Sequence, residues 1–288
     1  MLVTGFPAGA FAANCYIVAP APGEECVIID PGQDAQPGIE EVLAEHRLRP
    51  AAVLLTHGHI DHVWSVAPVC GAKGIPAYIH PDDRVLLSDP AKGFPLGAGQ
   101  QLFGGLEFTE PDDVKELADG MTLSLVGLEI VVNHAPGHTE GSVAFRMPLD
   151  PPNSAQGQSK TGAAETLGEA EGQSAAEGQS AAEGQSAAEG QSAAEGQSAA
   201  EAPRAPAGDP GGILFSGDLL FAGSIGRTDL PGGDYPTILR SLARVCLTLP
   251  DETVVLSGHG PQTTIGAERR TNPFLTGLTP ESGPRRGL

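Results

Sequence analysis

The chain has 288 residues and a formal net charge of −20, and it contains 39 glycines and 26 prolines. This length fits one large domain or two small ones. So acidic a protein is a poor partner for nucleic-acid phosphates or anionic lipids, because like charges repel. We therefore expect neither a nucleic-acid partner nor a membrane partner.

The cellular setting follows from the N-terminus and the cysteines. The first residues lack the basic and apolar segments of a secretory signal, and no apolar run reaches membrane-spanning length. Four cysteines lie far apart, without a C-x-x-C pair and each among apolar neighbours. Such cysteines are typical of reduced thiols in a protein core. We therefore predict a cytoplasmic protein, whereas the sequence makes no prediction of its oligomeric state.

Short apolar runs bounded by turn-forming residues predict strands, and longer periodic runs predict helices. In chain order we expect strands at 15–18 and 27–30, a helix at 38–47, a strand at 53–56, a helix at 64–72, a strand at 77–80 and a helix at 82–88. Strands at 121–126, 128–133, 143–147 and 213–216 follow, then a helix at 235–247 and a strand at 253–257. This order favours an α+β fold in which two sheets pack face to face beneath outer helices.

A low-complexity tract interrupts this pattern between 150 and 210. Within it, the unit Ala-Glu-Gly-Gln-Ser-Ala repeats five times from Ala170 to Ala199, and the tract holds ten acidic and two basic residues. It has no apolar periodicity, so it cannot bury enough surface to offset its ordering entropy. We predict a disordered insertion that enlarges the loop between the strands at 143–147 and 213–216. The sequence thus predicts one domain over 1–275, interrupted by 150–210 and followed by a flexible tail at 276–288.

The most specific motif follows the strand predicted at 53–56. It reads Thr-His-Gly-His-Ile-Asp-His and places His57, His59, Asp61 and His62 within six positions. Three adjacent imidazoles would repel one another if protonated, and would cost desolvation free energy if buried without partners. A metal ion removes both costs, and this donor set suits zinc, iron or manganese. The motif therefore predicts a metal site.

Three later segments share one pattern, an extended apolar run that ends in a polar residue beside glycine. They present His138, Asp218 and His259. Glycine allows the sharp turns that bring such side chains close to an ion. Each segment alone is a weak signal, but together with the first motif they supply seven candidate ligands, enough for two metal ions.

These motifs together resemble the metallo-β-lactamase superfamily, and within it the short bacterial form of the glyoxalase II (hydroxyacylglutathione hydrolase) branch. The resemblance also includes the segments 11–16, 28–32 and 219–229. It implies a four-layer αββα sandwich of two mixed sheets with outer helices. It also implies a cofactor of two divalent metal ions, with zinc expected and iron or manganese as alternatives.

The resemblance assigns the candidate ligands to two ions. One ion would be bound by three imidazoles, those of His57, His59 and His138. The other would be bound by a carboxylate and two imidazoles, those of Asp61, His62 and His259. The carboxylate of Asp218 would bridge both ions.

Three residues are expected to have further roles. Asp61 would orient the nucleophile or receive its proton. Asp30 would contact the ligands rather than the ions. Arg227 is a candidate for binding a substrate carboxylate, because guanidinium suits bidentate recognition, and the alternative is a local ion pair with Asp229 that fixes the loop.

The expected reaction is hydrolysis of a small acyl-glutathione-like thioester, in which two ions share a hydroxide that attacks the carbonyl. A thiolate leaving group needs little protonation, so no separate general acid is required. A persulfide dioxygenase of the same fold, with one iron held by two His and one Asp, is the alternative reading of the same motifs. A β-lactamase, a ribonuclease Z-like nuclease and a non-catalytic metal-binding protein fit less well, because of the missing signal peptide, the acidic charge and the full ligand set respectively.

Overall fold

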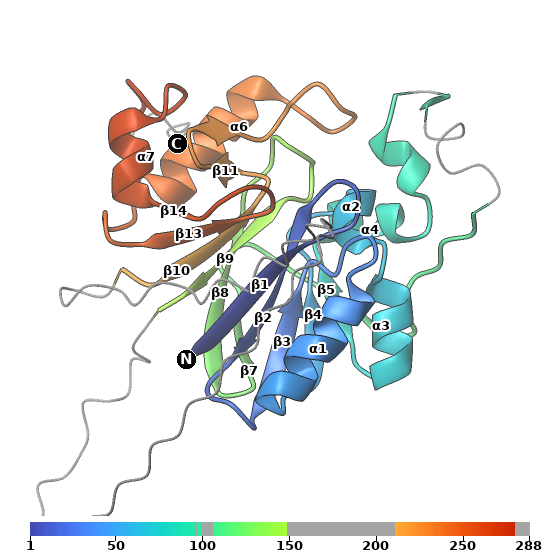
Figure 1. Ribbon diagram of the computed structural model, residues 1–288. Helices are drawn as coiled ribbons and strands as arrows, with labels where there is room; N and C mark the ends of the chain where they lie inside the picture. Colours follow the sequence, from blue (N-terminus) through green and yellow to red (C-terminus); the bar gives the residue numbers. More distant parts are fainter. Residues whose placement is uncertain (96, 99–105, 149–210, 280–288) are drawn as a thin grey trace, which may run out of the picture. The chain divides into compact units, whose positions relative to one another are not determined.

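Two six-stranded sheets face each other, and helices cover their outer faces (Figure 1). The computed structural model describes residues 1–95, 97–98, 106–148 and 211–279. All of these belong to one compact unit. The predicted α+β sandwich of two mixed sheets with outer helices is confirmed.

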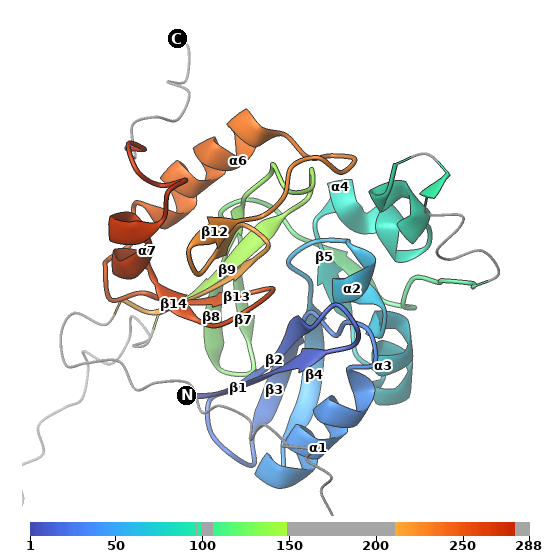
Figure 2. The same cartoon turned by 45° about the horizontal axis from the view of Figure 1, so that its top comes forward.

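The first sheet has the strand order β1-β2-β3-β4-β5-β6 and mixes both strand directions. Its antiparallel part consists of β1 (Leu2–Ala8), β2 (Ala13–Ala19) and β3 (Glu25–Ile29). Its parallel part adds β4 (Arg49–Leu54), β5 (Ala77–Ile79) and β6 (Val114–Glu116). The helices α1 (Gln36–His46) and α3 (Val66–Lys73) connect parallel neighbours and lie on the outer face of this sheet (Figures 1 and 2).

The second sheet has the order β14-β13-β10-β9-β8-β7. Its strands are β7 (Thr122–Leu125), β8 (Leu128–His134), β9 (Val143–Met147), β10 (Ile213–Gly217), β13 (Val254–Ser257) and β14 (Thr263–Thr264). Only β10 and β13 pair in parallel. The helix α6 (Tyr235–Ser241), with a π-helical turn at Leu242–Cys246, and the helix α7 (Ile265–Thr271) lie on the side of the sandwich opposite α1 and α3 (Figure 2). A small ribbon of β11 (Leu220–Phe221) and β12 (Ser224–Ile225) follows β10.

The alternation of side chains along β3 explains how the layers are held together. Val27 and Ile29 belong to the core between the sheets, which also contains Phe145 and Phe215. Cys26 and Ile28 point the other way, into the core beneath α1 and α3. Because successive side chains of a strand point to opposite faces, a strand buried on both faces reads as one continuous apolar run.

Some local predictions were wrong. The helix expected at 64–72 corresponds to α3, which begins only after Ser65, and a separate short helix, α2 (Ile60–Val63), was not predicted inside the histidine motif. Ser65 lies between α2 and α3, and its hydroxyl donates to the Gly32 carbonyl at 2.7 Å, which fixes the break between the two helices. The helix expected at 82–88 is a short α4 (Pro81–Arg84) followed by a 3₁₀ turn at Val85–Leu87, and a second 3₁₀ turn spans Pro90–Gly93.

The strands β9 and β10 are antiparallel neighbours, with Ile213 opposite Met147. The repeat tract therefore connects two paired strands, as predicted from the sequence. The predicted disorder of 150–210, and that of the tail from 280 to 288, falls outside the described residues. The part of the predicted tail at 276–279 is described, and there Leu278 packs against the core that contains Ile238 and Ile265. Among the residues that the structure describes, no helix is both long and apolar enough to cross a bilayer.

Candidate metal centre

Five of the seven candidate ligands lie on loops that follow strands, and the other two, Asp61 and His62, lie in the short helix α2. His57 and His59 follow β4, and His138 follows β8. Asp218 follows β10 and His259 follows β13. Strand ends of both sheets thus bring together side chains that lie up to 202 positions apart in the printed sequence.

His57, His59 and His138 form one cluster, here named the triple-histidine group. Their ligand atoms lie within 4.8 Å of one another, and all three residues are buried. Nδ1 of His59 lies 2.9 Å from Nε2 of His138. Three imidazole nitrogens therefore converge on one small volume, as a tetrahedral metal site requires.

Asp61, His62 and His259 form a second cluster, here named the mixed group. Their ligand atoms also lie within 4.8 Å of one another. Nε2 of His259 lies 3.2 Å from Oδ2 of Asp61 and 3.3 Å from Nε2 of His62. Two groupings of ligand atoms in the structure thus match the two sets of three that the resemblance implies, and a grouping of His57, His62 and Asp218 links them.

The carboxylate of Asp218 lies between the two groups. Its Oδ2 is 3.5 Å from Nε2 of His138 and 3.7 Å from Nε2 of His259, and its Oδ1 is 3.4 Å from Nε2 of His62. One carboxylate therefore faces both groups. Gly258 packs directly against it, since a Cβ at this position would lie 2.1 Å from Oδ1 of Asp218.

Three buried polar atoms at this centre have no hydrogen-bond partner among the residues that the structure describes. They are Nε2 of His57, Nε2 of His59 and Oδ1 of Asp218. Each buried polar atom left unpaired costs about 1–3 kcal/mol, so a cluster of three is expensive unless another group completes it. Imidazole and carboxylate donors converging in this way fit a divalent cation.

Two members of the triple-histidine group, His57 and His59, favour the neutral imidazole. Burial, followed by the charges of His62 and His138, holds the pKa of His57 well below its usual value. Burial and then His138 lower the pKa of His59. A neutral imidazole offers the lone pair that a metal needs.

The carboxylates of Asp61 and Asp218 dominate the electrostatics of the mixed group. Burial alone would lower the pKa of His62, but Asp218 and Asp61 outweigh it and raise the pKa. Burial alone would raise the pKa of Asp61, but His62 and His259 outweigh it and lower the pKa. The acidic side chains of Asp61 and Asp218 therefore make this side of the centre attractive to a cation.

Asp30 lies at the end of β3 and contacts the ring of a candidate ligand. It accepts hydrogen bonds from the backbone N–H of Thr56 at 2.8 Å and from the Thr56 hydroxyl at 2.6 Å. Its Oδ2 also lies 3.1 Å from Nδ1 of His62. A carboxylate at Nδ1 orients the opposite ring nitrogen, Nε2, toward the centre.

Arg227 contacts the centre through its backbone rather than its guanidinium. Nδ1 of His138 donates to the Arg227 carbonyl oxygen at 2.8 Å, which directs Nε2 of His138 toward the other ligands. The guanidinium binds both oxygens of Asp229, at 2.8 and 2.7 Å, and is largely exposed. Sequence reasoning missed this carbonyl because a backbone acceptor leaves no pattern of residue types. Binding of a substrate carboxylate by Arg227 stays a prediction.

A third cluster of potential ligands consists of His80, Asp82 and His134. The two imidazole rings are stacked, with centroids 4.1 Å apart and planes 4° apart. A metal lies in the plane of each ring that binds it, so two stacked parallel rings do not share one ion. We therefore assign this cluster a structural role rather than a metal-binding one.

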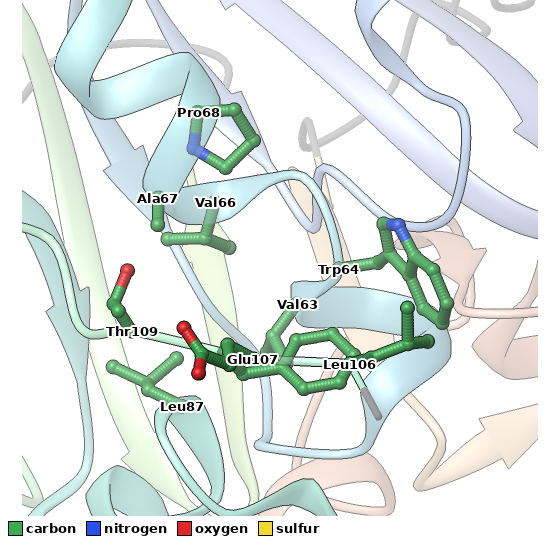
Figure 3. Close-up of a pocket in the computed structure, with 10 residues that line it drawn as sticks. Val63, Trp64, Val66, Ala67, Pro68, Leu87, Leu106, Glu107 and Thr109 are labelled. Atoms are coloured by element: carbon green, nitrogen blue, oxygen red, sulfur yellow. The ribbon is translucent and has the colours of Figure 1, made fainter. Parts of the chain in front are cut away.

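A separate cavity of about 250 Å³ lies beside α2 and α3 (Figure 3). Its lining is mostly apolar, and Trp64 and Phe108 pack edge to face with ring centroids 5.3 Å apart. Neither the triple-histidine group nor the mixed group contributes to its lining. The cavity is therefore distinct from the metal centre.

The family model of the metallo-beta-lactamase superfamily matches residues 8–150 and 209–259. The chain belongs to the metallo-beta-lactamase superfamily. An uncharacterized protein of Mycobacterium tuberculosis is 43% identical to it over 281 residues, which cover 97% of this chain and 100% of the relative. The hydroxyacylglutathione hydrolase GloC of Haemophilus influenzae is 28% identical over 273 residues, covering 93% and 95% respectively.

Two solved structures resemble the chain over 96% of its length and over the whole of their own. One is BLEG-1, described as a B3 metallo-beta-lactamase, with 32% identity and a TM-score of 0.66. The other is TTHA1623 in a di-iron-bound form, with 35% identity and a TM-score of 0.60. Superfamily membership and the clusters of His and Asp together make this protein a metallo-hydrolase that binds divalent metal.

Proposed function

We propose that this metallo-hydrolase binds two divalent ions and cleaves a small thioester of the acyl-glutathione kind. One observation carries the dinuclear part. The Asp218 carboxylate faces both the triple-histidine group and the mixed group, at 3.4–3.7 Å from a histidine nitrogen of each. A shared carboxylate between two complete sets of donors is the arrangement expected of a bridged pair.

When bound, two such ions lower the pKa of a shared water and polarise a carbonyl oxygen. The residues of the chain have separate tasks around this chemistry. Asp61 would orient the nucleophile and receive its proton, because its carboxylate lies among the donors of the centre. Asp30 and the Arg227 carbonyl hold the rings of His62 and His138 in orientation. A thiolate leaving group needs no further acid.

The thioester part rests on the relatives. GloC carries the name of a hydroxyacylglutathione hydrolase. The dinuclear part is supported by TTHA1623, which is 35% identical to this chain and has a di-iron-bound form. The metal is proposed to be zinc, and the di-iron relative keeps iron as the alternative.

A second candidate reaction is β-lactam hydrolysis, which the 32% identity to the B3 metallo-beta-lactamase BLEG-1 favours. In both reactions a nucleophile attacks a carbonyl carbon, so the same metal-binding side chains would serve either reaction. The persulfide dioxygenase expected as an alternative uses a single iron with two His and one Asp, and two sets of three donors favour the hydrolase over it.

The test combines metal analysis of the purified protein with three substrates: S-lactoylglutathione, a chromogenic cephalosporin and glutathione persulfide. We expect two ions per chain, hydrolysis of S-lactoylglutathione without oxygen consumption, and loss of that activity in Asp218→Ala. Faster turnover of the cephalosporin would favour the β-lactamase. One iron per chain with oxygen-dependent sulfite formation, or full turnover in Asp218→Ala, would overturn the proposal.

A further inference from the structure

Asp83, the third residue of α4, is a buried carboxylate outside both donor groups. It is 1% exposed and accepts three hydrogen bonds. Its Oδ2 accepts from the backbone N–H of Gly58 at 2.8 Å and from the Thr139 hydroxyl at 2.7 Å. Its Oδ1 accepts from the backbone N–H of Gly141 at 2.8 Å. No basic side chain pairs with this carboxylate in the part of the chain that the structure describes.

The three donors to Asp83 lie directly beside the triple-histidine group. Gly58 separates His57 from His59, and Thr139 follows His138. Asp83 therefore joins the loop after β4 to the loop after β8 without using any candidate ligand atom. The direct side-chain contact between these loops joins His59 to His138, two candidate ligands of the same cation, so binding of the cation would disturb this contact.

Two glycines allow this close approach. A Cβ at Gly141 would lie 2.6 Å from Cγ of Asp83, and a Cβ at Gly58 would lie 2.9 Å from the Asp83 backbone oxygen. Real Cβ atoms are essentially never found at such distances from their neighbours. The loops on both sides of Asp83 are therefore built to contact α4 without any intervening side chain.

We propose that Asp83 is a positioning residue, which sets the separation of His57 and His59 from His138 and so the affinity of the triple-histidine group for its ion. The proposal rests on the proposed function, because it assumes that this group binds a metal. Asp30 has the equivalent task in the mixed group, where it contacts His62. Each group of donors thus has its own buried carboxylate.

The chemistry of the contact requires an ionised carboxylate. Hydrogen bonds to a charged acceptor are about twice as strong as neutral ones, and only a carboxylate offers acceptors on both oxygens. In Asp83→Asn, the amide NH₂ must face a backbone N–H of Gly58 or of Gly141 in either orientation. The variant is expected to fold, since the backbone bond from Val143 N–H to the Thr56 carbonyl (2.7 Å) still joins the two loops at their base.

The experiment measures zinc stoichiometry and affinity by competition with a chromogenic chelator, using the full-length protein. Asp82→Asn is the matched control, because Asp82 is its neighbour on α4 and has a side chain that is 52% exposed. Loss of a group that holds metal ligands in position typically weakens metal affinity by about 10–100-fold. We expect Asp83→Asn to bind one zinc with unchanged affinity and the other about 10–100-fold more weakly, whereas Asp82→Asn matches the wild type.

Two further variants assign the weakened ion. In a His259→Ala background, which impairs the mixed group, adding Asp83→Asn should weaken the remaining zinc. In a His138→Ala background, which impairs the triple-histidine group, adding it should change nothing. Thr139→Val removes one of the three donors with little change of shape, and it should weaken the same ion even if Asp83→Asn does not fold.

A folded Asp83→Asn protein that binds both ions with wild-type affinity would overturn the proposal. So would unchanged zinc affinity in Thr139→Val, or equal effects of Asp83→Asn in the two backgrounds. A wild-type protein that binds fewer than two ions would instead contradict the proposed function, and the two failures are therefore distinguishable.

Discussion

Replacement of Asp30 by alanine should destabilise the protein even without metal. Asp30 is 2% exposed and accepts from the Thr56 N–H, the Thr56 hydroxyl and Nδ1 of His62. The Thr56 hydroxyl keeps a partner in Nδ1 of His57, 3.1 Å away, so Asp30→Ala leaves two buried donors unpaired. At about 1–3 kcal/mol for each unpaired donor, the expected loss is about 2–6 kcal/mol.

The backbone increases this loss. Asp30 has φ of 50°, in the left-handed region, which aspartate tolerates better than alanine and which costs an ordinary residue about 1–2 kcal/mol. Asp30→Asn is the matched variant, because asparagine also tolerates this conformation and keeps an acceptor for the Thr56 N–H. Only the His62 contact is then lost, so its expected loss is about 1–3 kcal/mol.

The assay is equilibrium urea unfolding in the presence of a chelator, so that metal affinity does not contribute to the comparison. We expect the free energy of unfolding to fall in the order wild type, Asp30→Asn, Asp30→Ala. A loss below about 0.5 kcal/mol for Asp30→Ala, which is the range of ordinary surface substitutions, would refute the reasoning.

Three further predictions follow from the structure. Deletion of 155–205 should leave turnover and thermal stability unchanged, because the tract connects paired strands and loop length contributes little to stability; a lost activity would show that the tract takes part in function. All four cysteines are buried, and burial raises the pKa of the Cys26, Cys70 and Cys246 thiols to about 12, so the native protein should not react with a thiol reagent at pH 8, and rapid labelling of any of them would contradict this. Treatment with a strong chelator should abolish hydrolysis, and added zinc should restore it; activity that survives complete metal removal would exclude a metal-dependent mechanism.

Much of this fold could be predicted because strands that are buried on both faces are continuous apolar runs in the sequence. The strand predicted at 143–147 coincides with β9, and the one predicted at 27–30 lies within two residues of the bounds of β3. The strand β1 was missed, since Gly5 and Pro7 weaken its pattern, and proline is tolerated there because β1 is an edge strand. The helix α7 was missed because it is short and has a glycine in its first turn.

The candidate ligands could be predicted because metal-binding residues cluster in the sequence and lie beside glycines. Asp83 could not, since its partners are two backbone N–H groups and a hydroxyl located 25 to 58 positions away. Such contacts depend on the tertiary fold and do not restrict which residue types surround Asp83 in the sequence. The Arg227 carbonyl was missed for the same reason.

The most direct test of the central claim is anomalous diffraction from crystals of the zinc-loaded protein. We predict two anomalous peaks per chain, one among His57, His59 and His138 and one among Asp61, His62 and His259, with the Asp218 carboxylate between them. A single peak at full zinc occupancy, or peaks away from Asp218, would contradict a bridged pair of ions.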